Sequence, residues 1–116
     1  MPARTRRRAK FDFRGRRFVW WVDADRYLRI CSLDKKFIIS LSLWGAAPEV
    51  VEVIGQEFPG LDRSERRPVW LIAPPASGTS MGSRVNELLT WSFSRDRPLT
   101  RADPPRASNR GFLGER

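Results

Sequence analysis

The chain of 116 residues is long enough for one folded domain and too short for two. It contains no histidine and a single cysteine, Cys31, which excludes an internal disulfide and argues against a histidine-based active site and a structural zinc site. The net charge of +9 comes from the two ends of the chain, because residues 18–94 hold eight basic and nine acidic residues.

The first part of the chain is basic. Residues 1–17 contain eight basic residues and one acidic residue, with few apolar side chains to bury, so we predict a disordered basic tail over residues 1–16. Such a segment binds polyanions by releasing counterions, and the alternative is an ordinary solvated tail. The candidate polyanion-binding residues are Arg4, Arg6, Arg7, Arg8, Lys10, Arg14, Arg16 and Arg17.

Five short segments rich in β-branched and aromatic residues follow, and each is predicted to be a strand. They span residues 18–22, 27–33, 37–44, 49–55 and 68–73. In the third segment, Phe37, Ile39 and Leu41 alternate with Ile38 and Ser40, which is typical of a strand with two different faces. Because short polar turns join the segments, we expect an antiparallel meander.

The pattern then changes to a helical one. Apolar residues recur at three- and four-residue spacing from Met81 to Phe93, which predicts an amphipathic helix of about 15 residues. Ser80 or Thr79 is its expected N-cap. We therefore predict one α+β domain over residues 17–97, with an antiparallel five-stranded meander sheet and one C-terminal helix packed on one face. Residues 98–116, rich in Pro and Arg, are predicted to be a second disordered tail.

One helix can cover only one face of such a sheet. The face expected under the helix is apolar and consists of Phe18, Trp20, Leu28, Ile30, Phe37, Ile39, Leu41, Val51 and Val53. The other face mixes tryptophans with polar and charged residues, which makes it a candidate contact surface. The alternative is an ordinary solvated sheet face. The predicted partner-binding residues are Trp21, Arg29, Ser40, Ser42 and Trp44.

The segment before the helix matches Gly-x-Ser-x-Gly, the pattern of a nucleophile elbow. A serine nucleophile needs a base, and the chain has no histidine, so we interpret this segment as a loop that ends in a helix cap. A weaker hypothesis is an anion site at the helix start, formed by Ser80, Gly82, Ser83 and Arg84. The acidic residues are too scattered to predict a metal site.

From these residues we predict a small non-enzymatic module that binds a protein partner, or a second copy of itself, through the mixed sheet face. The second hypothesis is a nucleic-acid-associated protein that uses the arginine-rich N-terminal tail. We expect no cofactor, no metal and no membrane insertion, because the longest apolar run, Phe18–Val22, is too short to span a bilayer. Cytoplasm is the expected location, since no secretory signal is predicted.

Overall fold

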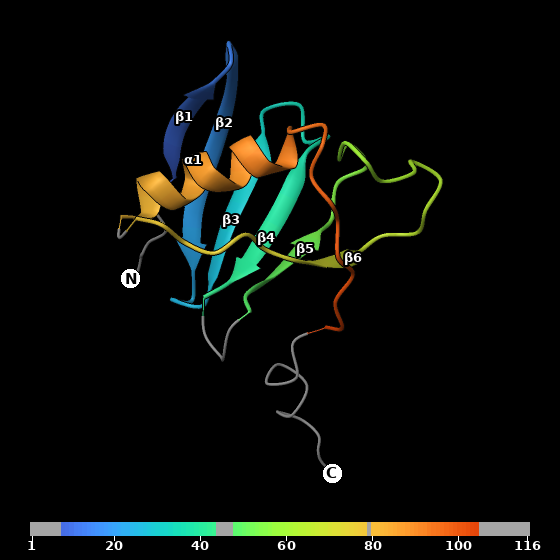
Figure 1. The fold of residues 1–116 in the computed structure, drawn as a ribbon. Coiled ribbons are helices and arrows are strands. Elements are labelled where there is room, and N and C mark those ends of the chain that lie inside the picture. The colour runs from blue at the N-terminus through green and yellow to red at the C-terminus, as the bar shows by residue number, and fades with distance from the viewer. Residues whose placement is uncertain (1–7, 44–47, 79, 105–116) are drawn as a thin grey trace.

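The computed structural model describes residues 8–43, 48–78 and 80–104. Within these ranges an antiparallel six-stranded sheet has its strands in chain order, and a helix lies across one face of it (Figure 1). The predicted α+β class and meander are confirmed. The elements are β1 (Ala9–Phe13), β2 (Arg16–Asp23), β3 (Tyr27–Ser32), β4 (Ile38–Ser42), β5 (Val50–Val53), β6 (Val69–Ile72) and α1 (Met81–Ser92).

The prediction of five strands was wrong, because β1 lies in the segment that we assigned to the disordered N-terminal tail. In β1, Lys10 and Asp12 alternate with Phe11 and Phe13, and both phenylalanines contact the core. This alternation is a strand pattern, but the surrounding arginines dominated the composition from which we predicted disorder. Residues 1–7 lie outside the described residues.

The start of the predicted C-terminal tail also contacts the sheet. The amide of Ile72 donates to the carbonyl of Thr100 at 2.9 Å, and the amide of Ala102 donates to the carbonyl of Trp70 at the same distance. Leu71 and Arg101 form an antiparallel bridge. This segment therefore occupies the outer edge of β6, which would otherwise present unpaired backbone groups. Residues 105–116 lie outside the described residues.

The sheet face under α1, which we call the helix face, forms the core. Its predicted apolar residues are fully buried except Trp20, which is partly exposed and packs against the others. Val85, Leu88 and Leu89 of α1 complete the core from above. Burial of each such side chain contributes about 1.5–3 kcal/mol, so this face provides most of the stability of the fold.

The helix begins after Ser80, one of the two predicted N-caps; the Ser80 hydroxyl accepts a hydrogen bond from the Ser83 amide at 3.1 Å. The 12 residues of α1 make a helix about 18 Å long, so it covers only part of the helix face. Phe58 and Leu61, from the loop between β5 and β6, bury the remainder. α1 is the only helix in the described ranges, and it is too short to cross a membrane.

The loop between β5 and β6 is held close to the sheet. A Cβ atom at Gly55 would lie 2.3 Å from the Lys36 carbonyl oxygen, so only glycine fits there. The Arg67 guanidinium donates to four backbone carbonyls of the same loop. These contacts fix Glu57 and Pro59 near the hairpin formed by β1 and β2.

Candidate functional site

A row of five residues crosses the sheet on the side away from α1, which we call the open face. The register pairs Trp21 with Arg29, Arg29 with Ser40, Ser40 with Glu52, and Glu52 with Trp70. Directly paired residues point to the same side of a sheet. These five residues, which we call the transverse row, therefore lie side by side across β2 to β6, with a tryptophan at each end.

Smaller side chains flank the transverse row. On one side, Val19, Cys31 and Ile38 are paired across β2, β3 and β4. The Cys31 thiol is buried and donates to the Ser32 carbonyl at 3.1 Å, and burial raises the pKa of the Cys31 thiol above its ordinary value. Because a nucleophilic cysteine needs a lowered pKa, Cys31 serves packing here.

The residues on the other side of the transverse row are polar near β3 and β4 and apolar near β5 and β6. Ser42 pairs with Tyr27, and Val50 pairs with Ile72, so a polar end adjoins an apolar one. The predicted residue Ser42 is thus on the open face and is buried. The predicted residue Trp44 lies outside the described residues.

The centre of the transverse row contains polar atoms whose hydrogen-bonding capacity is unused. Ser40 is 2% exposed, and neither its hydroxyl nor the Nε of Arg29 has a hydrogen-bond partner among the described residues. Arg29 Nε lies 3.3 Å from a carboxylate oxygen of Asp23, and the Arg29 guanidinium lies over the Tyr27 ring. An unsatisfied buried polar group costs about 1–3 kcal/mol, so stability alone does not explain this choice of residues.

Trp70 and its partner Glu52 are the two residues of the transverse row that were not among the predicted partner-binding residues. Residues 69–72 are Val, Trp, Leu and Ile, so both faces of this strand are apolar and the alternation that separated the faces of β4 is lacking. Glu52, which pairs with Trp70, is the only residue whose type indicates this face in the sequence. A charged residue in β5 marks the side of the sheet that the core does not occupy.

The structure separates the predicted polyanion-binding residues. Arg8 lies over the Trp21 ring at 4.2 Å from its centroid, and Lys10 is paired with Val19, so both belong to the open face. The remaining described members are at the β1–β2 hairpin, where Arg16 is bound to Glu57 and Arg17 to Asp12. Arg4, Arg6 and Arg7 lie outside the described residues.

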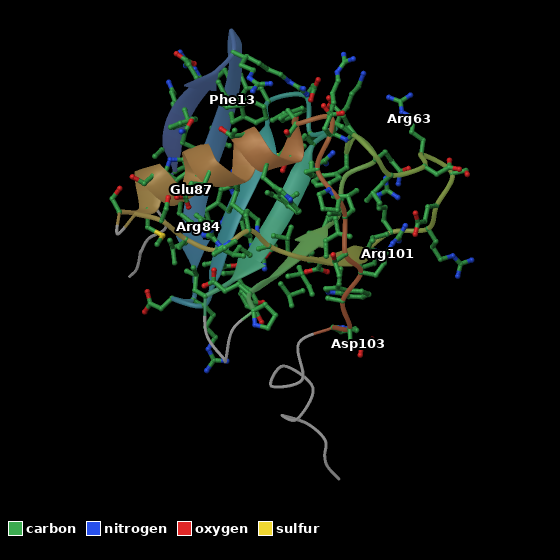
Figure 2. All side chains as sticks on the ribbon, in the orientation of Figure 1. Phe13, Arg63, Arg84, Glu87, Arg101 and Asp103 are labelled. Carbon is green, nitrogen blue, oxygen red and sulfur yellow. The ribbon has the colours of Figure 1, made fainter. Side chains whose placement is uncertain are left out.

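The helix start gives no support to the anion site that we predicted there. The Ser80 hydroxyl and the Ser83 amide bind each other, and Gly82 has no neighbour that its missing Cβ would touch. The Arg84 guanidinium, which is buried, donates to Glu49 at 2.6 Å and to Glu87 at 3.1 Å. Figure 2 shows Arg84 and Glu87 on the same side of α1. Two of the protein's own carboxylates thus already bind the guanidinium of the predicted site.

Comparison with known proteins gives no guide to function: the chain matches no family model, no curated protein and no solved structure. Within the described ranges, no three acidic or cysteine side chains come together as a metal site requires. The function of the chain therefore has to be inferred from its own surfaces, beginning with the open face.

Proposed function

We propose that this protein is a binding module whose open face docks a protein partner, either another chain or a second copy. The observation that supports it is the transverse row, in which Trp21 and Trp70 flank Arg29, Ser40 and Glu52. Tryptophan and arginine are the residues most enriched at the energetic centres of protein interfaces. In the described part of the chain, no helix covers this face.

The charges of the open face favour a protein over a polyanion. Its cations are Arg8, Lys10, Arg17 and Arg29, and its anions are Asp12, Asp23 and Glu52. Two of the cations are paired with neighbouring carboxylates. A nearly balanced surface with both signs selects a partner by complementarity, whereas a nucleic-acid surface needs several unpaired cations.

The size of the sheet suggests how far the contact extends. Six strands at about 4.8 Å spacing and five residues of strand length give roughly 24 Å by 17 Å, or about 400 Å². A standard interface takes about 800 Å² from each partner. We therefore expect the partner to extend past the sheet onto the edge formed by Arg8 and Lys10.

Affinity capture from cells of the source organism tests this proposal. The full chain is compared with a Trp21→Ser/Trp70→Ser variant and with Leu33→Ser, a control that removes an exposed apolar side chain from the β3–β4 turn. We expect one stoichiometric protein, or a second copy seen by light scattering, that the double variant loses and the control keeps. A folded double variant that keeps every partner would refute the proposal.

A second candidate function is nucleic-acid binding, and the position of Arg8 over Trp21 favours it. Through this contact Arg8 is placed on the open face, where the partly exposed indole of Trp70 is available to stack on a base. Deletion of residues 1–7 would then abolish a salt-dependent affinity for RNA or DNA. Capture that survives nuclease treatment, and a deletion variant that binds like the full chain, would exclude this candidate.

A further inference from the structure

A pocket at the tip of the β1–β2 hairpin is separate from the open face. It lies where the hairpin, the end of α1 and the β5–β6 loop meet, and it has a volume of about 350 Å³. That volume is in the range of pockets that bind small molecules. Figure 2 labels Phe13, the last residue of β1, near the tip of this hairpin. The pocket is lined by Phe13, Arg14, Arg16, Phe18, Pro59, Phe93 and Arg95.

The floor of the pocket is aromatic. The rings of Phe13 and Phe93 are 6.0 Å apart and inclined at 31°, and Phe93 lies 6.1 Å from Phe18. Phe18 is fully buried, whereas Phe93 is partly exposed. Phe13 is only 8% exposed, so the accessible aromatic surface of the pocket comes mainly from Phe93, which can accept a flat, apolar group by stacking or edge contact.

The rim of the pocket is cationic, and two of its charges are uncompensated. Arg16 binds both oxygens of Glu57, at 2.9 and 2.7 Å, so its charge is already matched. Arg14 and Arg95 form no ion pair with any residue in the described part of the chain, and no carboxylate lines the pocket. An anionic group would therefore find two guanidinium groups that no carboxylate of the described residues already binds.

The end of α1 does not oppose an anion in this place. The carboxyl end of a helix carries partial negative charge, which would repel a bound anion. Here Arg97 donates to the carbonyls of Ser92 and Ser94, at 2.9 and 2.6 Å. Arg97, which does not line the pocket, thus compensates the partial negative charge of the helix end. Arg95 is not needed for this and lines the pocket.

The turn between β1 and β2 holds the side chain of Arg14 at the pocket. Arg14 and Gly15 form the two-residue turn of the hairpin, with φ of 52° and 79°. Such turns favour Asn, Asp or Gly, because other residues are strained at positive φ. The strained Arg14 places its guanidinium 4.8 Å from the centre of the Phe13 ring, at the rim of the pocket. Ala24, Asp25 and Lys35 also have positive φ in other turns, so it is the position of the guanidinium that supports the site.

We propose that this pocket binds a small organic anion in which a flat ring is joined to a phosphate or a carboxylate. The ring would lie against Phe93, and the anionic group would bind Arg14 and Arg95. This ligand site is independent of the open face, so it can fail or succeed without affecting the proposed partner binding.

Titration of the full chain followed by amide NMR tests the proposal. The probes are adenosine 5′-monophosphate and indole-3-acetate. Adenosine and inorganic phosphate, the two parts of the first probe, are the controls. We expect shifts of the Gly15 and Arg95 amides with at least one of the two ring-bearing anions, at an affinity about tenfold or more above that of either half. Which anion binds tells phosphate from carboxylate. Equal binding of adenosine or of phosphate, or no shift with either anion, would overturn the proposal.

Variants of the two arginines make the test residue-specific. Arg14→Asn keeps a residue suited to the turn, and Arg95→Gln keeps a polar side chain at an exposed position. Each is expected to weaken binding about tenfold, since each removes a charged hydrogen-bond donor. Arg101→Gln, at the outer edge of β6 and well separated from Phe13 in Figure 2, is the control and should bind as the natural chain does. Unchanged affinity in both pocket variants would refute the site.

Discussion

Two neighbouring rows of side chains cross the same strands on opposite faces of the sheet. On the helix face, the register aligns Trp20, Ile30, Ile39, Val53 and Val69, which are all apolar. On the open face, each position is shifted by one residue, and the transverse row combines two tryptophans with an arginine, a serine and a glutamate. The four residues that follow Trp20 in the first row are buried, whereas Trp21 and Trp70 keep part of their surface exposed.

This difference separates stability from recognition within one sheet. A fully apolar row gains free energy from every residue that it buries. The transverse row contains an unpaired hydroxyl and a guanidinium nitrogen without a hydrogen bond, which lowers stability relative to an apolar row of the same shape. Both atoms are buried, so a partner can reach this row only through its residues other than Ser40, which are partly exposed.

The largest expected effect compares two adjacent isoleucines of β4. Ile39 is fully buried on the helix face, and Ile38 is partly exposed on the open face. Ile39→Ala should lower the free energy of unfolding by about 3 kcal/mol, because it leaves a cavity in the core. Ile38→Ala should lower it by about 1 kcal/mol. Urea unfolding measures both, and equal losses would contradict the assignment of the two faces.

A matched pair of arginines should show the same contrast on a smaller scale. The Arg84 side chain is 5% exposed and binds two carboxylates, whereas Arg29 is 33% exposed and has a single ion pair at 3.3 Å. Arg84→Gln should cost about 2 kcal/mol, since it breaks charged hydrogen bonds that attach α1 to the sheet. Arg29→Gln should cost less than about 0.5 kcal/mol. A reversed order in thermal unfolding would show that the open face also supports the fold.

The acid dependence of stability tests the wall of the hairpin pocket. The two hydrogen bonds from Arg16 hold the pKa of the Glu57 carboxyl below its ordinary value of 4.5. A carboxyl with a lowered folded-state pKa stabilises the fold above its ordinary pKa, and this contribution disappears as the pH falls through the folded value. Glu57→Gln and Arg16→Gln should therefore each flatten the loss of stability below about pH 4.5. An unchanged pH profile would mean that this pair does not persist in solution.

The smallest effect is expected at the hairpin turn. Arg14→Asn replaces a strained residue by one that favours positive φ, and it should raise the stability by about 0.5 kcal/mol. When both the stability and the ligand affinity of this variant are measured, the role of Arg14 in the turn can be separated from its proposed role in ligand binding. A variant that is less stable than the natural chain would show that Arg14 supports the turn.

The sequence predicted the parts of the molecule in which local patterns are unambiguous. Alternation from Phe37 to Ser42 located β4 and its two faces, and the helical period located α1 and its Ser80 cap. β1 was missed because the charges around Phe11 and Phe13 resemble those of a disordered segment. The assignment of residues to the open face succeeded for Trp21, Arg29 and Ser40, whose strands alternate clearly.

Features that depend on distant segments could not be predicted in this way. The hairpin pocket joins Phe13, Pro59 and Phe93, which are far apart in the sequence and are brought together by the meander and the helix. The pairing of Arg84 with Glu49 connects residues 35 positions apart, so the anion site predicted from local sequence alone overlooked the competing carboxylate. Local composition indicates which charged and aromatic side chains a segment contributes, but the packing of distant segments decides which of them are already bound within the protein.

Cross-linking in living cells tests the docking role of the open face most directly. A photoreactive amino acid is introduced at Ile72, beside Trp70 on this face, or at Asn86, an exposed position of α1 that serves as the control. We expect an adduct of one defined mass from position 72 that is absent from position 86 and is lost when Trp21→Ser is added. Equal labelling from both positions, or an adduct that Trp21→Ser leaves unchanged in a folded protein, would contradict the assignment of this face to a partner.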